Sequence, residues 1–440
     1  MRIAYLTAGA AGMYCGSCMN DNAIAKELLE AGHDCVLMPV YTPIKTDVED
    51  VSVGKVFLGG INVFLAQKLK FFRKTPKWIE NLLNQPWLIR QLTRNAGKTS
   101  PSFLGELTVS MLQGVEGNQQ QEFDELLRWL KMDVRPDAII LTNLLIGGAI
   151  PELRRNADVW VTLQGDDIFL DSLPQAYREE AIAKMRTLVP SVQGFICHSD
   201  DYASRMSELL NIPSSKLFIV PLGVETDDFL PDPQSTPSNS GNSKEIRLGY
   251  LARLAPEKGL HQLVDAFIAL RKTGKWDRLK LQVAGWAGPQ HASYLKEQQT
   301  KLRAAGLENQ YNILGSVSRR QKIDFLNSLD LFCVPTTYAD PKGIYLLEAV
   351  ACGLPYVMPD HGAFPELHRR ITQHSPQSNG ALYAHASPDA LRDCLEETLL
   401  GLGRKSQAAP DLISEIDIST HAKRLLITLQ GKPSNSVSLS

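Results

Sequence analysis

Short apolar segments alternate with longer amphipathic ones along most of the chain, a pattern that predicts strands followed by helices. In the first half, apolar runs bounded by polar or Gly-rich residues predict strands at Arg2–Thr7, Cys35–Val40, Ala138–Thr142, Val159–Leu163, Gly194–Cys197 and Leu217–Val220. A helix is predicted over Asn20–Ala31, between the first two strands. Alternation of strand and helix favours a parallel sheet with right-handed crossovers.

A second alternating set begins at Ile246 and predicts a second parallel sheet. Its expected strands are Arg247–Leu251, Lys280–Ala284, Tyr311–Leu314, Leu331–Val334 and Tyr356–Met358. Residues 231–245, which precede it, are rich in Pro, Ser and Asn and predict a flexible linker. The fold class is therefore expected to be α/β, with two Rossmann-like parallel-sheet domains joined by this linker. Near the end, Asp411–Gln430 is predicted to form one amphipathic helix.

The bulk composition narrows the class of protein. The 440 residues suit two domains of about 200 residues each. The 46 basic and 48 acidic residues nearly balance, which argues against a nucleic-acid partner. Seven scattered Cys favour a reducing compartment, so a cytoplasmic protein is expected. The chain start is read as a strand and loop rather than a signal peptide, and the apolar stretch Ala138–Pro151 is too short to span a bilayer.

Residues Tyr338–Gly353, YADPKGIYLLEAVACG, carry two acids, Asp340 and Glu348, around a predicted helix. The helix is expected over Ile344–Cys352, because its composition favours a helix and a Gly stands at each end. Backbone N–H groups at its start favour an anion such as phosphate. Glu348 lies about one and a half turns farther on, where it can accept hydrogen bonds from the hydroxyls of a ribose. The alternative is a buried helix with one solvated Glu.

Residues Leu248–Gly259, LGYLARLAPEKG, place Arg253 and Lys258 in a loop between a predicted strand and a predicted helix. Two cations at the carboxyl end of a strand are suited to clamp a diphosphate. Taken singly, each is more typical of a solvated surface charge. Together with Asp340 and Glu348 they favour a nucleotide-sugar site, with phosphate at the helix start, ribose beside the second acid and sugar beside the first.

These two segments, followed by Gly362–Glu366 (GAFPE), resemble the donor half of retaining glycosyltransferases of family 4, the glycosyl transferases group 1, which have the GT-B fold. Val220–Phe229 (VPLGVETDDF) resembles the family's segment between the first domain and the linker. The resemblance implies transfer of a sugar from a nucleoside-diphosphate sugar to a hydroxyl of a glycan, lipid or small molecule. Retained anomeric configuration and no metal or other cofactor are implied as well.

The resemblance also implies domain limits. An acceptor-side domain is expected at residues 1–230, the donor domain at 246–408, a C-terminal helix that crosses back at 409–430, and a disordered tail at 431–440. Two alternatives stay open. One is a nucleotide-sugar-binding protein without transferase activity, and the other is a phosphorylase or hydrolase on a similar scaffold.

The same resemblance assigns roles to individual residues of the donor half. It implies that Arg253 and Lys258 neutralise the diphosphate leaving group and that Asp340 contacts the transferred sugar. Further donor-binding residues are the backbone at the helix start and the ribose acid, namely Gly343, Ile344, Tyr345 and Glu348. The chain departs from the family pattern in having Asp340 where Glu is usual and Lys342 where an aromatic residue is usual. These departures leave the identity of the donor sugar open, including a donor that carries a negative charge.

The Gly-rich loop after the first strand has a spacing that does not match a dinucleotide fingerprint. A nicotinamide enzyme is therefore disfavoured. Gly12 and Gly16 are instead expected to let the backbone approach the donor phosphate or the acceptor. Cys15 and Cys18 form a CxxC in this loop, but a zinc site needs four ligands, so two small residues packed in a turn are favoured.

Four polar residues after two predicted strands are candidates for the acceptor side, namely Asn143, Gln164, Asp166 and Asp167. Gln164 stands near the position where many relatives have a His that faces the transferred sugar. Asp166 or Asp167 is expected to contact the acceptor or accept its proton. Capping of the following helix explains either Asp equally well.

The stretch between Tyr41 and Leu130 lacks strand alternation and predicts a helical insertion over about residues 45–130. Within it, residues 67–98 hold eight Lys or Arg against one acid, with aromatic and aliphatic side chains between them. We favour packing of this surface on the domain with its basic residues solvated. The alternatives are peripheral contact with an anionic membrane and contact with an anionic acceptor. We hypothesise that this insertion selects the acceptor.

Overall fold

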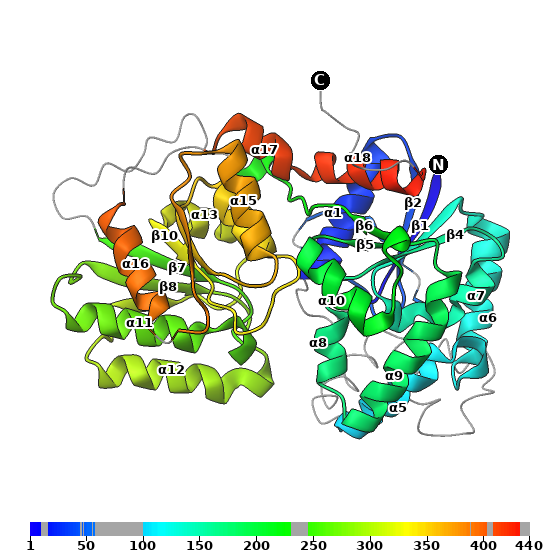
Figure 1. Cartoon of the computed structure of the whole chain (residues 1–440), viewed down its shortest axis with the longest axis horizontal. Coiled ribbons are helices and arrows are strands. Elements are labelled where there is room, and N and C mark those ends of the chain that lie inside the picture. The colour runs from blue at the N-terminus through cyan, green and yellow to red at the C-terminus, as the bar shows by residue number, and fades with distance from the viewer. Residues whose placement is uncertain are drawn as a thin grey trace. The chain divides into compact units, whose positions relative to one another are not determined.

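The computed structural model describes residues 1–9, 16–44, 46, 48–54, 56–57, 100–229, 245–387, 389–402 and 408–431. These residues divide into two compact units. The first runs from Met1 to Pro221 and includes the residues from His421 onward, and the second runs from Leu222 to Thr420 (Figure 1). Each unit contains a parallel six-stranded sheet with helices, which is the predicted α/β class with two Rossmann-like domains.

The first sheet has the strand order β2-β1-β3-β4-β5-β6. Its strands are β1 (Arg2–Thr7), β2 (Asp34–Pro39), β3 (Ala138–Leu141), β4 (Asp158–Thr162), β5 (Gly194–Cys197) and β6 (Leu217–Ile219). All six match the predicted strands to within one residue at either end. The near-continuous apolar runs of β1 to β5 are largely buried because helices cover a parallel sheet on its faces, whereas the three residues of β6 are partly buried.

Helices of the first unit connect these strands. The longer ones are α1 (Gly16–Glu30), α5 (Pro101–Leu112), α6 (Gln120–Trp129), α8 (Asp166–Asp171), α9 (Gln175–Leu188) and α10 (Asp200–Leu210). The described part of the predicted insertion thus holds α5, whose first turn is capped by Ser100, and α6. Residues 67–98 lie outside the described residues, so their basic surface and its membrane contact stay predictions.

The second sheet has the order β12-β11-β10-β7-β8-β9. Its strands are β7 (Ile246–Leu251), β8 (Leu279–Ala284), β9 (Tyr311–Ile313), β10 (Leu331–Cys333), β11 (Tyr356–Pro359) and β12 (Gly380–Tyr383). Five of them were predicted to within one residue. The sequence prediction missed β12, because its four residues GALY form no distinct apolar run.

Helices of the second unit lie on both faces of its sheet. They are α11 (Leu260–Lys272), α12 (Ala292–Ala304), α13 (Arg319–Ser328), α14 (Ile344–Ala351), α15 (Phe364–His374), α16 (Ala390–Leu400) and α17 (Pro410–Ile416). In Figure 1, α11 and α12 lie side by side next to β7 and β8. Large apolar side chains fill the core between the layers, among them the fully buried Phe267, Phe332 and Phe364. Within the described ranges no helix has the length and apolar character needed to cross a bilayer.

The prediction of one helix over Asp411–Gln430 is wrong, because the chain breaks at Asp417 into α17 and α18 (Ile418–Leu429). At the break, the backbone of Val224 pairs with both neighbours of Asp417, through its N–H to Ile416 O and its C=O to Ile418 N. The Asp417 carboxylate accepts hydrogen bonds from Ser419 N and from Thr226 Oγ1. These contacts come from a distant segment, so helical periodicity alone could not reveal them.

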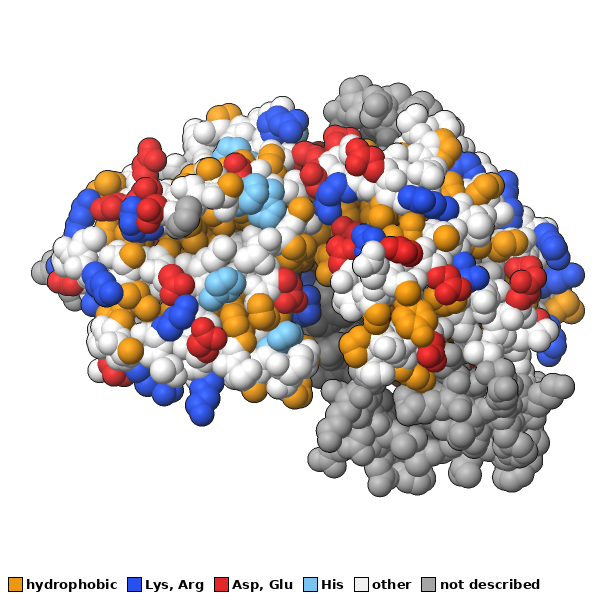
Figure 2. Space-filling model, turned by 60° about the horizontal axis from the view of Figure 1, so that its bottom comes forward, with side chains coloured by type: hydrophobic (Ala, Val, Ile, Leu, Met, Phe, Trp, Pro, Cys, Tyr) orange, Lys and Arg blue, Asp and Glu red, His pale blue; other side chains and the backbone are white. Residues whose placement is uncertain are grey.

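Charges are distributed evenly over the described surface in view. Figure 2 shows Lys and Arg interspersed with Asp and Glu over both units. Opposite charges also pair in each unit, as Arg178 does with Asp171 in the first and Lys301 with Asp265 in the second. This distribution agrees with the formal net charge of −2.

Candidate functional site

Lys258, Asp340 and Gly343, three of the predicted donor-site residues, meet at the point where the order of the second sheet reverses, between β7 and β10. Strands on either side of such a point leave a space at their carboxyl ends, where ligands of open α/β sheets bind. Two loops follow β7 and β10 there, and they interlock. Gly259 adopts φ +75°, and a Cβ at this position would lie 1.6 Å from Pro335 O. Thr337 N donates a hydrogen bond to Glu257 O at 3.0 Å, so the first loop lies directly against the second.

This interlocking brings Lys258 against Asp340. Lys258 Nζ donates to Asp340 Oδ2 at 2.6 Å, and the two side chains are 10% and 5% exposed. Nζ also donates to Tyr338 OH at 2.6 Å. The ammonium lies 4.8 Å from the ring centroid of Tyr338 and 5.0 Å from that of Tyr345, which are distances for cation–π attraction.

Asp340 accepts hydrogen bonds on both of its oxygens. Oδ1 accepts from the backbone N–H groups of Lys342 and Gly343, both at 3.0 Å. Oδ2 accepts from Lys258 Nζ and also from the hydroxyls of Tyr345 at 3.0 Å and Tyr338 at 3.1 Å. Burial alone would raise the pKa of Asp340, but the charge of Lys258 and these hydrogen bonds outweigh it and hold the pKa well below its usual range. Asp340 is therefore an anion at neutral pH.

Helix α14 begins directly after this turn. Gly343 adopts φ +61°, and a Cβ there would come within 2.7 Å of Leu367 Cδ1 and 2.9 Å of Phe364 Cε1. Only glycine fits both the backbone conformation and the space. The helix then starts at Ile344, as predicted, and its start lies beside the Asp340 carboxylate.

Glu348 has a partner that the sequence did not indicate. Its Oε1 accepts from Lys322 Nζ of α13 at 2.7 Å, and both side chains are largely buried. Lys322 Nζ also lies 5.7 Å from the ring centroid of Phe229. Lys322 is 26 residues from Glu348 in the sequence, so only the packing of α13 against α14 brings the pair together.

Arg253 lies in a different environment from Lys258. Its side chain is 47% exposed, and Nη2 pairs with Glu257 Oε1 at 3.1 Å. Tyr250 OH donates to the carbonyl oxygens of both Arg253 and Lys258, at 3.1 and 3.3 Å, and so fixes the loop between them. The two predicted cations therefore share one loop. Lys258 is buried in an ion pair, and Arg253 lies at the surface.

The predicted acceptor-side residues gather at the carboxyl ends of β3 and β4 in the first unit. Asn143 Oδ1 accepts from Ile146 N at 3.1 Å, and Gln164 Nε2 donates to Thr142 O at 2.9 Å. Asp166 is buried, and its Oδ1 accepts from Leu144 N at 2.7 Å. Burial raises the pKa of Asp166 to about 6. Gln164 and Asp166 thus tie the two neighbouring loops together.

Asp166 and Asp167 begin α8, although the residue at its N-cap is Gly165, which forms no capping bond through a side chain. Asp167 accepts from Tyr202 OH and pairs with Arg205 Nη1, both at 2.8 Å. Of the predicted glycines, Gly16 is the first residue of α1, whereas Gly12 lies outside the described residues. Cys18 of the CxxC is buried, and Cys15 also lies outside them.

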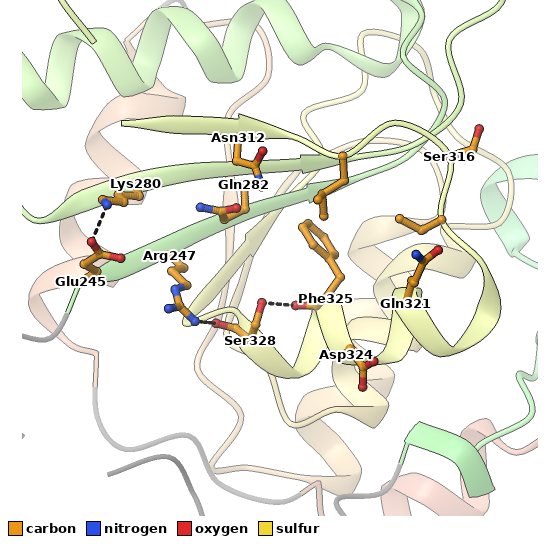
Figure 3. Close-up of a pocket in the computed structure, with 12 residues that line it drawn as sticks. Glu245, Arg247, Lys280, Gln282, Asn312, Ser316, Gln321, Asp324, Phe325 and Ser328 are labelled. Carbon is orange, nitrogen blue, oxygen red and sulfur yellow. Dashed lines mark hydrogen bonds and ion pairs between the residues drawn. The ribbon is translucent and has the colours of Figure 1, made fainter. Parts of the chain in front are cut away.

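A groove of about 490 Å³ lies elsewhere on the second sheet. Figure 3 shows Arg247, Gln282 and Asn312 of β7 to β9 on one wall, with Phe325 and Ser328 of α13 on the other. Lys280 pairs with Glu245 at its rim. None of the predicted site residues that the structure describes lines this groove.

Part of the chain, mostly in the second unit, is similar to known proteins. Residues 233–407 match the family model Glycosyl transferases group 1. A GDP-mannose-dependent alpha-(1-6)-phosphatidylinositol monomannoside mannosyltransferase of Mycobacterium tuberculosis is 28% identical over 204 residues, which are 44% of this chain and 49% of that protein. Mannosylfructose-phosphate synthase of Agrobacterium fabrum is 29% identical over 151 residues, 33% of each chain. The chain thus matches half or less of the length of these relatives.

Solved structures share the fold over nearly the whole chain. Sucrose-phosphate synthase from Thermosynechococcus elongatus has a TM-score of 0.68 at 15% identity, covering 98% of this chain and 99% of that one. HepE of Anabaena in complex with UDP has a TM-score of 0.64 at 17% identity, covering 98% and 100%. Together with the two parallel sheets, these likenesses show a GT-B fold made of two Rossmann-like domains.

Proposed function

We propose that the chain is a retaining, metal-independent glycosyltransferase of family 4. It moves a sugar from a nucleoside-diphosphate sugar to a hydroxyl of a glycan, a lipid or a small molecule. The observation that carries the proposal is the buried ammonium of Lys258 beside the start of α14, at the reversal point of the sheet. The family match over residues 233–407 covers all of these elements.

The positive groups around this point suit a diphosphate leaving group. Lys258 provides an ammonium, Arg253 a guanidinium on the same loop, and Ile344 and Tyr345 contribute N–H groups at the helix start. Negative charge grows on the diphosphate as the bond to the sugar breaks, so donors fixed in advance stabilise the transition state. These protein groups supply the counter-charge, and on this proposal the reaction proceeds without a metal.

Retention follows if the acceptor hydroxyl approaches the face from which the diphosphate leaves. The acceptor oxygen forms the new bond to the anomeric carbon while the bond to the diphosphate breaks. The acceptor proton passes to an oxygen of the leaving phosphate. A double displacement would instead need a carboxylate nucleophile next to the sugar, and Asp340, the acid of the donor loop, is engaged on both oxygens.

A thermal-shift panel tests nucleotide binding. UDP, GDP, ADP and their common sugars are added to the wild type, to Lys258→Ala and to Lys280→Ala, which removes a lysine remote from the site. One diphosphate family should stabilise the wild type and the control, by about 2.7 kcal/mol at 100 times its dissociation constant. Lys258→Ala should lose the effect. No stabilisation by any nucleotide would overturn the proposal and favour a phosphorylase or hydrolase.

Turnover separates a transferase from a protein that only binds nucleotide sugars. The stabilising nucleotide sugar is incubated with glycan, lipid and small-molecule acceptors, and release of the nucleoside diphosphate is measured with and without EDTA. Transfer that continues in EDTA and yields a product with the donor's anomeric configuration is expected. Binding without release across the acceptors would favour the non-catalytic alternative, and an inverted product would contradict the retaining assignment.

A further inference from the structure

We propose that Asp340 is a positioning residue that holds Lys258 and the start of α14 in place for the diphosphate and does not contact the transferred sugar. The inference rests on the proposed function. It differs from the sugar contact that the resemblance implies for this position. The reason lies in the hydrogen bonds that this particular side chain already makes.

The carboxylate of Asp340 has no acceptor capacity left for a sugar hydroxyl. An ionised carboxylate offers about four lone-pair positions. Five donors already occupy them, namely Lys258 Nζ, Tyr338 OH, Tyr345 OH, Lys342 N and Gly343 N. With the side chain 5% exposed, a sugar could reach Asp340 only by breaking bonds that neutralise Lys258 or order the turn before α14.

The backbone keeps Asp340 in this position. Its carbonyl oxygen accepts from Ala363 N at 2.9 Å. The carboxylate accepts from Lys342 N and Gly343 N, the second and third residues after it, so the side chain folds back onto its own turn. A negative group at this point is also favoured by the dipole of α14. Asp340 therefore fulfils a structural requirement of the turn before any ligand binds.

Lys258 remains able to bind phosphate while it is held. An ammonium has three N–H donors, and the bonds to Asp340 and Tyr338 use two of them. The third is left for a phosphate oxygen. Burial lowers the pKa of Lys258, Asp340 opposes this, and the nearby charges of Arg253 and Lys342 lower it further. Asp340 thus keeps Lys258 charged in a place where burial favours the neutral amine.

The two possible roles of Asp340 predict different ligand preferences for Asp340→Asn. The probe is whichever of UDP, GDP or ADP stabilises the wild type, measured by calorimetry beside its sugar conjugate. A positioning residue predicts that affinity falls about tenfold or more for the free diphosphate and equally for the conjugate, because a charged hydrogen-bonding partner of phosphate is impaired. A sugar contact predicts unchanged affinity for the free diphosphate and loss for the conjugate alone, and this result would overturn the inference.

Two further measurements exclude a merely structural effect. In the Lys258→Ala background, the weak diphosphate binding that remains is measured at higher ligand concentration. There Asp340→Asn should lower the affinity much less than it does in the wild type, because the part of its effect that passes through Lys258 is absent. The affinity of the wild type divided by that of Asp340→Asn should also shrink as pH falls, because Lys258 of the variant becomes protonated. Titration of the nucleotide's own phosphate affects both proteins equally and cancels in this ratio. The proposal would be contradicted if the losses of diphosphate affinity from Lys258→Ala and Asp340→Asn were additive. A ratio of the two affinities that does not change with pH would also contradict it.

Tyr345→Phe and Tyr338→Phe provide milder variants if Asp340→Asn fails to fold, since each removes one donor to Asp340 Oδ2. Equal losses for the diphosphate and its conjugate support the inference, and loss for the conjugate alone contradicts it. Absence of any diphosphate binding by the wild type would overturn the proposed function itself, and this inference with it.

Discussion

Replacement of Lys258 by Met should destabilise the second unit in a way that depends on Asp340. Met has a similar length and keeps the contact with the rings of Tyr338 and Tyr345. It also leaves the Asp340 carboxylate without its cation in a buried place. Removing one partner of a buried ion pair costs about 3–5 kcal/mol. Because four other hydrogen bonds to Asp340 remain, a value of about 3 kcal/mol is expected.

The cost should depend on pH with a definite sign. In the wild type the pKa of Asp340 lies below its unfolded value, so its contribution to stability is constant at neutral pH and is lost only in strong acid. Without Lys258, burial becomes the dominant influence and raises this pKa. In Lys258→Met the Asp340 carboxylate then takes up a proton as pH falls, which removes the unpaired buried charge. The loss of stability should therefore be smaller at pH 5 than at pH 8.

Thermal unfolding of four proteins tests this reasoning: the wild type, Lys258→Met, Asp340→Asn and the double variant. A loss of about 3 kcal/mol corresponds to about 6–12 °C in Tm for a unit of this size. The double variant should be more stable than Lys258→Met at pH 8, because it has no buried charge to leave unpaired. The account would be refuted if the double variant were no more stable than Lys258→Met at pH 8. It would also be refuted if the stability lost on Lys258→Met did not change with pH.

Other predictions concern activity and the first unit. Arg253→Ala should lower kcat by about 100-fold while leaving Tm nearly unchanged, because the side chain is half exposed; a large fall in Tm with normal kcat would contradict this. Glu348→Gln should raise the donor KM more than it lowers kcat, and Lys322→Met should do the same because it releases the Glu348 carboxylate. Both variants should also discriminate less between ribose and 2′-deoxyribose diphosphates in binding assays, and unchanged discrimination would argue against a ribose contact. The raised pKa of Asp166, about 6, means that its ionisation costs stability as pH rises from about 4 to 6. Asp166→Asn should therefore gain in Tm relative to the wild type over that range, and parallel pH profiles would contradict the buried-acid interpretation.

Much of the fold could be predicted because parallel strands are buried on both faces and appear as continuous apolar runs. The strand β12 was missed because its short sequence GALY forms no distinct apolar run. The single helix expected over Asp411–Gln430 was wrong for another reason. Helical periodicity continues through Asp417, and the break depends on Val224 and Thr226, which lie far away in the sequence.

The candidate site was predictable in its members but not in its pairings. Residue type and spacing indicated Lys258, Asp340 and Glu348 as a set. The sequence assigned them to phosphate, sugar and ribose, and these assignments stay predictions. It did not indicate that Asp340 pairs with Lys258 and Glu348 with Lys322. Pairings of this kind depend on where the loops and helices pack, and charge alone does not specify which acid meets which base.

The close approach of Gly259 to Pro335 has a consequence for engineering. The loops after β7 and β10 fit together through this contact and through the bond from Thr337 N to Glu257 O, although β8 and β9 lie between them in the sequence. A chimera that receives only one of these loops from a relative would combine surfaces that were never matched. Attempts to change donor choice by exchanging segments should therefore transfer residues 253–259 and 335–343 as one cassette.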